Sequence, residues 1–505
     1  MGKWKSLEVV VEQIQDGATV AISGSGGGLL EADAVLAALE RRFLATGHPR
    51  NLTVVHALGI GDGKGSGLGR FAHPGMVKRV IGGHWRWSPA MQELARTEQI
   101  EAYSFPAGVL ATLFREIGAG RPGVITRVGL GTFADPRVNG GKINASATDD
   151  LVEVVSLGGE EYLRYKPFKI DFAIVMASAA DEKGNVTTRH EPADLDVYAL
   201  ALAASNSGGK VIVQVKRRIQ SGEHISPRQV RIPGVLVSTL VEVPTQPQCQ
   251  IAEYDPTLSG ESRCEISGTE QEAPIVIRRL VAERAARELV PGQSVNFGFG
   301  FPGAIPGLLA AEGQEGAYWC TVEQGIHNGN MLDGVMFGAA RNADAIVASV
   351  DQFDFYSGGG IDITFLGMGE MDAEGNVNVS KLGTTVVGPG GFMDITHGAK
   401  KVVFCGAFET KGLEIQEDGE NVSIISPGEI PKLVERVRHV TFSGREARKA
   451  GKEVLYVTER AVFRLDPEGV RLVEVAPGVD VEKDVLARMG FAPLVDSSLL
   501  VNVTN

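Results

Sequence analysis

The sequence predicts an α/β fold: two related open α/β domains with mostly parallel sheets, fused in one chain. Three observations lead to this prediction. The chain has 505 residues, and at roughly 150 residues per domain this length suggests two or three domains. Short β-branched runs alternate with longer amphipathic runs, as in strand–turn–helix units. The two halves of the chain also share diverged copies of the same segments.

The clearer of the two matches lies in the later part of each half. Asp171–Val186 reads D-F-A-I-V-M-A-S-A-A-D-E-K-G-N-V, and Asp362–Val377 reads D-I-T-F-L-G-M-G-E-M-D-A-E-G-N-V, 191 residues later. The same offset aligns Lys210 with Lys401, so the match extends over some 45 residues. Only two copies exist, which excludes a solenoid and indicates a chain of two related halves.

A second match lies near the start of each half. Asp16–Gly28 resembles Pro291–Gly303 at an offset of 275 residues, so the first half carries about 84 extra residues between its two matches. The segment between the halves, Pro244–Pro274, is polar and proline-bearing, as expected of a linker or exposed crossover. We therefore predict an N-terminal domain over residues 1–270, which carries the insertion, and a C-terminal domain over residues 271–505.

Within each half, β-branched apolar runs predict buried parallel strands and amphipathic runs predict helices. Near the C-terminus, three short runs predict a small antiparallel meander, followed by a last helix. In chain order, the expected elements are helices at Leu7–Ile14 and Ala34–Phe43, strands at Phe172–Met176 and Val211–Val215, a helix at Ile275–Leu289, strands at Ala345–Val350 and Val402–Cys405, meander strands at Glu453–Val457, Val462–Leu465 and Val470–Val475, and a last helix at Asp480–Met489.

Composition excludes several classes of function. The net charge is −13, which argues against binding nucleic acid through its phosphates. No apolar run reaches about 18 residues, so we expect no membrane span. The four cysteines have no C-x-x-C spacing and the nine histidines no H-x-x-x-H pair, so we expect neither a disulfide framework nor a metal site. A reducing, cytoplasmic location fits this cysteine usage.

A glycine-rich turn in the second half raises the possibility of dinucleotide binding. Gly298–Gly303 reads G-F-G-F-P-G, and Glu323 lies 20 residues beyond it, the spacing of a pyrophosphate turn and a ribose-binding acid. This pattern favours an NAD-dependent oxidoreductase. Pro302 and Pro306 weaken it, because both fall where the first turns of the following helix should form. Tight packing of strand on helix explains the glycines equally well.

Glu323 is the strongest candidate for chemistry. It ends an apolar strand in T-V-E-Q-G-I-H-N-G and opens a glycine turn, so it can be partly desolvated and still reachable. Carboxylates in such positions form covalent intermediates with activated acyl groups. The alternative, an ordinary glutamate in a surface loop, stays open from the residues alone. We expect His327 to border this site and His84 to be a packed structural residue.

A second glycine cluster is a candidate anion site. The segment Gly388–Asp394 reads G-P-G-G-F-M-D and places glycine next to an aromatic residue. Successive backbone N–H groups in such a turn can form an oxyanion hole. Hairpin geometry is the competing explanation.

Several long motifs, in order, resemble the family I CoA-transferases, and most closely the single-chain acetate/propionate (short-chain acyl-CoA) CoA-transferases. These motifs are T-V-E-Q-G, D-Q-F-D-F-Y-S-G-G-G-I-D, G-P-G-G-F-M-D and, at Gly129–Arg137, G-L-G-T-F-A-D-P-R. The similarity extends over nearly the whole chain. The resemblance also accounts for the duplication, since these enzymes combine two related α/β domains.

The resemblance implies a mechanism and assigns roles. Glu323 would be the nucleophile that forms a glutamyl-CoA thioester, with Gln324 in place of the asparagine of the common S-E-N-G motif. The oxyanion-hole glycine would be one of Gly388, Gly390 and Gly391. Gly300 and Gly325 are the candidates for binding substrate.

The expected reaction moves coenzyme A from a short-chain acyl-CoA to a carboxylic acid such as acetate or propionate. Coenzyme A is then a substrate, and no cofactor or metal is needed. The family also implies a homo-oligomer. Two alternatives remain: an acyl-CoA hydrolase on the same fold, in which water intercepts the intermediate, and the NAD-dependent oxidoreductase.

Overall fold

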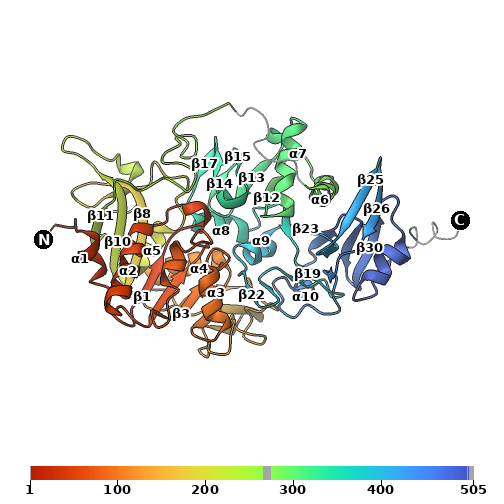
Figure 1. The fold of residues 1–505 in the computed structure, drawn as a ribbon, viewed down its shortest axis with the longest axis horizontal. Coiled ribbons are helices and arrows are strands. Elements are labelled where there is room, and N and C mark those ends of the chain that lie inside the picture. Colours follow the sequence, from red (N-terminus) through yellow and green to blue (C-terminus); the bar gives the residue numbers. More distant parts are fainter. Residues whose placement is uncertain (1, 266–274, 497–498, 500–505) are drawn as a thin grey trace.

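Two β-sheets flanked by helices form the frame of the molecule (Figure 1). The computed structural model describes residues 2–265, 275–496 and 499. The first sheet is built from residues between 19 and 242 and the second from residues between 294 and 495. The predicted domain boundary at residue 270 lies outside the described residues.

The first sheet has eight strands in the order β11-β10-β8-β1-β2-β3-β4, with β9 paired to β8. All pairings are parallel except that of β9 with β8, which agrees with the predicted sheet type. Its strands are β1 Thr19–Ile22, β2 Leu52–His56, β3 Val77–Gly82, β4 Glu101–Ser104, β8 Phe172–Ala180, β9 Val186–Thr187, β10 Lys210–Arg218 and β11 Thr239–Glu242. The extra residues of this half form a small sheet of β5 Val124–Thr126, β6 Val152–Leu157 and β7 Glu160–Tyr165.

The second sheet has ten strands in the order β17-β14-β13-β12-β18-β23-β28-β29-β30-β31. The central strands from β13 to β28 are parallel, and β14, β17, β29 and β30 add antiparallel pairings at the two sides. Its strands are β12 Ser294–Phe297, β13 Trp319–Val322, β14 Ile326–His327, β17 Ala345–Ile346, β18 Ile363–Gly367, β23 Lys401–Cys405, β28 Glu453–Val457, β29 Ala461–Asp466, β30 Gly469–Val475 and β31 Leu494–Val495. The predicted meander is confirmed as β28–β29–β30.

The helices and short hairpins surround these sheets. Among the described residues, none of the helices is long and apolar enough to cross a bilayer. The helices are α1 Leu7–Val11, α2 Asp33–Thr46, α3 Pro89–Arg96, α4 Ala107–Gly118, α5 Val197–Asn206, α6 Val276–Ala286, α7 Ile305–Ala311, α8 Ser349–Ser357, α9 Phe392–Gly398 and α10 Gly444–Lys449. The hairpin strands are β15 Asn330–Met331, β16 Ala340–Arg341, β19 Glu370–Met371, β20 Val377–Asn378, β21 Lys381–Leu382, β22 Thr385–Val386, β24 Glu409–Thr410, β25 Glu414–Asp418, β26 Asn421–Ser426 and β27 Ile430–Pro431.

The strand register reproduces the duplication read from the sequence. In the first sheet Val20 on β1 pairs with Phe172 on β8, and in the second Val295 on β12 pairs with Ile363 on β18. These pairs are related by the two predicted offsets, 275 and 191 residues. The pairing of β8 with β10 recurs in the same way as that of β18 with β23. The central strands of the two sheets, β10-β8-β1-β2 and β23-β18-β12-β13, therefore share one parallel arrangement.

The repeated aspartates explain part of this shared pattern. Asp171 accepts a hydrogen bond from the Thr19 N–H at 3.0 Å, and Asp362 accepts one from the Ser294 N–H at 2.9 Å. Each carboxylate thus satisfies a backbone donor at the first residue of the neighbouring strand. A side chain that fixes where a central strand begins helps set the sheet register.

Two predicted elements are wrong. Ala345–Val350 is not a buried parallel strand: β17 covers two residues and pairs antiparallel with β14, and α8 begins at Ser349. A short apolar run does not distinguish a strand from the start of a buried helix. Asp480–Met489 is not one helix, because a wide π-type turn at Val481–Val485 leads into a 3₁₀ turn at Leu486–Arg488. In the 3₁₀ turn, the Arg488 guanidinium forms an ion pair with the buried Glu409 carboxylate, at 2.6 Å between Nη2 and Oε1.

The segment predicted to be an exposed linker is partly buried where the structure describes it, up to residue 265. Cys249 and Leu258 are buried and pack with Leu29 of the first half and Met336 of the second. The Gln250 N–H donates to the Gly27 carbonyl at 2.8 Å. This part of the crossover therefore packs against both halves. The sequence did not predict this packing, because the segment is mostly polar and its isolated apolar residues show neither helical nor strand periodicity.

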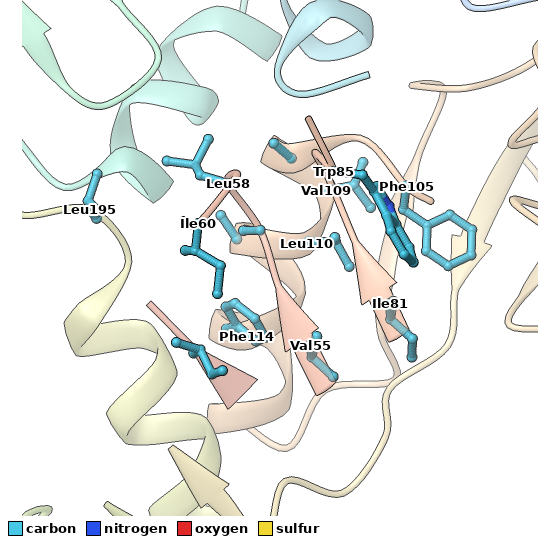
Figure 2. Close-up of a cluster of buried hydrophobic side chains, with 14 of the residues drawn as sticks. Val55, Leu58, Ile60, Ile81, Trp85, Phe105, Val109, Leu110, Phe114 and Leu195 are labelled. Carbon is cyan, nitrogen blue, oxygen red and sulfur yellow. The ribbon is translucent and has the colours of Figure 1, made fainter. Parts of the chain in front are cut away.

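One apolar core cluster contains residues of both halves, including buried residues of α4, α8 and α9, and a second lies within the second half. Figure 2 shows Leu110 and Phe114 of α4 in the same buried cluster as Val55 of β2 and Ile81 of β3. On the side of the second half, Gly108 of α4 lies against Phe353 of α8 and Asp394 of α9, and Arg115 pairs with Asp354 of α8. The helix therefore ties the first sheet to the second.

Leu110→Ala should destabilise the protein by about 2–5 kcal/mol, because truncating a buried leucine removes apolar contacts and leaves a cavity. Leu110 is 1% exposed, whereas Leu44 on α2 is 63% exposed. The matched variant Leu44→Ala should change stability by less than about 0.5 kcal/mol. Urea unfolding followed by circular dichroism measures both. Equal shifts in the two midpoints would contradict the assignment of α4 to the core.

Candidate active site

A cavity of roughly 240 Å³ lies between the two halves of the molecule. Its walls come from segments that follow the carboxyl ends of strands in both sheets, including Ser25–Gly26 after β1, Leu58–Gly59 after β2, His84–Trp87 after β3, Gly298–Phe299 after β12 and Glu323–Gln324 after β13. In each sheet the order of strands reverses beside β1 or β12, and open α/β sheets bind ligands at such switch points. The cavity therefore lies where open α/β sheets place their ligand sites.

Glu323 projects into this cavity directly after β13. The chain reverses just beyond it at Gly325, which has a φ of +97°. A β-carbon there would lie 2.0 Å from the Val347 carbonyl oxygen, so only glycine fits this turn. The tight turn leaves the Glu323 carboxylate at the cavity wall, partly exposed as the sequence predicted.

The Glu323 carboxylate is packed against the glycine loop from a distant part of the chain. A β-carbon on Gly391 would lie 2.0 Å from Glu323 Oε2, so the absence of a side chain creates the space that the carboxylate fills. Burial raises the pKa of Glu323 to about 7, and the nearby Gly391 N–H, which favours the charged form, offsets part of that rise.

The three glycines predicted for the oxyanion hole differ in where their N–H groups point. The Gly388 N–H donates to the Ser380 carbonyl at 2.9 Å, and the Gly390 N–H donates to the Gly83 carbonyl at 2.8 Å. Both donors are therefore used by the fold. Gly391 is the glycine of the three whose N–H meets Glu323.

Gln324, the residue after the nucleophile candidate, forms part of the contact between the halves. Its side chain is 3% exposed, and its amide nitrogen donates to Ser25 Oγ at 3.2 Å. A β-carbon on Gly338 would lie 2.3 Å from its amide carbon, so the side chain is enclosed. Gln324 lines the cavity, and its buried Oε1 has no hydrogen-bond partner among the described residues.

The segment after β3 adds residues to the cavity wall. His84, predicted to be a packed structural residue, lines the cavity, and burial lowers its pKa to about 4, so at neutral pH its imidazole is neutral. Arg86 holds its guanidinium 4.9 Å from the centre of the Phe299 ring, near Trp87. Within G-G-H-W-R-W, residues 82–87, the sequence singled out only His84. The position of this segment directly after β3 is the signal that could have indicated Arg86 as a cavity residue.

The remaining predicted residues lie beside the cavity and do not line it. Gly300 precedes a 3₁₀ turn at Phe301–Ala304 that leads into α7, and no atom lies within 4 Å of the place where its β-carbon would be. Gly325 forms the turn described above. His327 lies on β14 and accepts a hydrogen bond from the Trp319 indole at 2.9 Å. A role of Gly300 or Gly325 in substrate binding stays a prediction.

Comparison with known proteins identifies the family. The sequence pattern of the family described as Coenzyme A transferase matches residues 5–243. The chain is 38% identical to the acetate CoA-transferase YdiF of Escherichia coli K12 over 98% of its own length and 93% of that protein. It is 40% identical to the caffeate CoA-transferase of Acetobacterium woodii, over 99% and 96% of the two chains.

Solved structures agree with these matches. The crystal structure of acyl-CoA transferase (YdiF) apoenzyme from Escherichia coli O157:H7 superposes with a TM-score of 0.93 at 37% identity, covering 98% of this chain and 94% of that chain. A thioester complex of the same protein with CoA superposes with a TM-score of 0.92, covering 99% and 94%. Together with the sequence matches, they show that this chain belongs to the coenzyme A transferase family and is a CoA-transferase.

Proposed function

We propose that this CoA-transferase moves coenzyme A from a short-chain acyl-CoA to a carboxylic acid such as acetate or propionate, through a covalent thioester on Glu323. The observation that carries the proposal is the Glu323 carboxylate, held against the Gly391 N–H in the cavity between the halves. The thioester complex with CoA solved for the similar Escherichia coli protein supports it. The cavity of roughly 240 Å³ must hold the acyl group and the end of the CoA arm together, which favours a short acyl chain.

The first half-reaction exchanges one thioester for another. A Glu323 carboxylate oxygen attacks the thioester carbonyl carbon, the carbon–sulfur bond breaks, and CoA leaves as a thiolate. The product is a mixed anhydride between Glu323 and the acyl group. The thiolate then attacks the glutamyl carbonyl carbon and expels the acyl group as a carboxylate, leaving CoA on Glu323 as a thioester.

The second half-reaction runs the same steps backwards with a different acid. The acceptor carboxylate attacks the glutamyl thioester and releases CoA thiolate, which then attacks the acceptor's carbonyl carbon in the new anhydride. Glu323 leaves as a carboxylate and the new acyl-CoA departs. One thioester replaces another, so the exchange is nearly isoenergetic and needs no ATP. Ping-pong kinetics follow from this scheme.

Each attack on a carbonyl creates a negatively charged oxygen that must be stabilised. One well-placed donor in a water-poor site is typically worth about 3–4 kcal/mol of barrier lowering. The Gly391 N–H, which faces the Glu323 carboxylate, is the candidate for this donor. Binding of the remote parts of CoA supplies orientation energy in addition.

The two alternatives read from the sequence have less support. The two relatives that are 38% and 40% identical over nearly the whole chain are CoA-transferases, which disfavours an NAD-dependent oxidoreductase. A hydrolase on the same fold would turn over acyl-CoA without an acceptor acid, and no observation among the described residues favours it.

We further propose a cytoplasmic homo-oligomer, on the family resemblance and the four free thiols.

Glu323→Gln should lower kcat of CoA transfer by about 10³-fold or more, because the amide cannot form the anhydride and the covalent route is lost. Initial rates with acetyl-CoA and propionate measure this. The matched control Glu182→Gln changes an exposed glutamate and should keep the wild-type rate. Full turnover in Glu323→Gln would rule out Glu323 as the nucleophile.

The rate of the first half-reaction should rise with pH around a midpoint near 7. The ionised carboxylate is the nucleophile, and burial raises the pKa of Glu323 to about 7, so protonation removes the nucleophile as the pH falls through that value. Well below the midpoint, kcat/KM should fall about tenfold per pH unit. Single-turnover formation of protein-bound CoA, with release of the donor acid, measures the profile. A rate that stays constant down to about pH 5 would mean that Glu323 ionises at its ordinary pKa of about 4.3.

Gly391→Ala should reduce kcat by about 10²–10³-fold, the usual loss when an oxyanion donor is displaced. The new β-carbon would fall 2.0 Å from Glu323 Oε2, so loop and carboxylate must move apart. Gly316→Ala is the control, because no atom lies within 4 Å of its added β-carbon. Wild-type kcat in Gly391→Ala, with the fold intact by circular dichroism, would rule out the Gly391 N–H as the oxyanion donor.

A further inference from the structure

Asp394 is a buried carboxyl group that the proposed chemistry does not use. It lies three residues after Gly391, in the first turn of α9, and is 1% exposed. Its Oδ2 accepts a hydrogen bond from the Gly108 N–H at 3.0 Å, and Gly108 belongs to α4 in the other half of the molecule. The side chain therefore joins the glycine loop of one half to a helix of the other.

The contact satisfies a helix end that has no cap of its own. Pro106 precedes α4 and supplies no side-chain hydrogen bond to the first turn. The first N–H groups of a helix need acceptors, and Ser, Thr, Asp or Asn side chains usually provide them from the preceding residue. Here Asp394 provides the acceptor from across the interface.

Glycine at position 108 makes this approach possible. A β-carbon there would lie 2.6 Å from the Asp394 carboxyl carbon and 2.5 Å from the Phe353 ring. Gly108 has ordinary helical backbone geometry, so the glycine is required by the neighbours and not by its own conformation. The first turn of α4 is thus shaped to receive this carboxyl group.

The same turn of α4 also holds the loop that carries the oxyanion donor. The Ala107 N–H donates to the Gly390 carbonyl at 2.8 Å, while the Gly390 N–H donates to the Gly83 carbonyl at 2.8 Å. The next residue along the loop is Gly391, whose N–H meets Glu323. The loop is therefore fixed at Gly390 by its backbone and, four residues later, at Asp394 by its side chain.

We propose that Asp394 is a positioning residue for CoA transfer: by capping α4 across the interface, it holds the Gly388–Gly391 loop so that the Gly391 N–H meets the oxyanion formed at Glu323. This inference rests on the proposed function. Its requirement is a hydrogen-bond acceptor at this place in the side chain, which asparagine also supplies. A misplacement of about 1 Å in a reacting group can cost a factor of about 100 in rate.

Two substitutions of Asp394 separate positioning from general structural damage. Asp394→Ala removes the acceptor and should lower kcat about 10- to 100-fold, with KM for acyl-CoA changed less than about threefold. Asp394→Asn keeps an acceptor for the Gly108 N–H and should retain kcat within about threefold of the wild type. Rescue by asparagine is a result that loss of packing alone does not produce. An unchanged kcat in Asp394→Ala, or equal impairment of both variants, would overturn the inference.

Two further variants keep the test decisive if Asp394→Ala does not fold. Gly108→Ala forces the carboxyl group away from α4 and should lower kcat as Asp394→Ala does, whereas wild-type kcat in Gly108→Ala would overturn the inference. Asp372→Ala is the matched control. Asp372 is also buried and accepts backbone hydrogen bonds, from Asn376 at 3.1 Å and Val437 at 2.9 Å, and it does not line the cavity. Per folded molecule, the control should keep wild-type kcat.

The readout also separates failure of this inference from failure of the proposed function. Rapid-quench measurement follows the rate at which protein-bound CoA appears from acyl-CoA. Wild-type protein that transfers CoA without ever binding it covalently would defeat the proposed function. Covalent CoA that appears in Asp394→Ala as fast as in the wild type would defeat the positioning role alone.

Discussion

The site depends on keeping one carboxylate in a place that is poor in water. The Glu323 carboxylate lies in the cavity between the halves, where burial raises its pKa to about 7 and one backbone N–H favours its charged form. Solvation by bulk water would make the carboxylate a weaker nucleophile and would weaken the donor that must stabilise the oxyanion. The surrounding contacts serve this balance. Neither half of the molecule provides it alone, because the strand that carries Glu323 and the segments that close the cavity come from different sheets.

Both halves contain the duplicated parallel strands, but only the second half carries the candidate nucleophile, Glu323. The β1–β2 register aligns Thr19 with Thr53, and the β12–β13 register aligns Ser294 with Trp319. Thr53 and Trp319 are therefore equivalent positions in the two halves. Four residues after Thr53 comes Ala57, and four residues after Trp319 comes Glu323, so Ala57 occupies in the first half the position that Glu323 has in the second. The first half supplies supporting contacts instead, such as the Gly83 carbonyl that accepts the Gly390 N–H. At the shared site, the second half therefore supplies the candidate nucleophile and the first half supplies supporting contacts.

Features that repeat or lie close together along the chain could be predicted from the sequence. The two offsets of the duplication gave the strand register, and the T-V-E-Q-G turn and the G-P-G-G loop indicated Glu323 and the glycines around it. Features that exist only after the halves pack could not be predicted. The hydrogen bond between Asp394 and Gly108 joins residues 286 positions apart, and although Asp394 ends the G-P-G-G-F-M-D motif, nothing in the sequence pairs it with Gly108. The burial of Leu258 in the crossover and the place of Arg86 beside Phe299 depend on packing in the same way.

The central claim is that Glu323 carries coenzyme A as a thioester midway through each cycle. The most direct test is intact-protein mass spectrometry after mixing the enzyme with acyl-CoA and no acceptor acid, followed by peptide mapping. The account predicts a mass increase equal to CoA less one water, located on the peptide that contains Thr321–Gly329 and removed when a carboxylic acid is added. Unmodified protein throughout rapid CoA exchange, or a modification at any other residue, would contradict it.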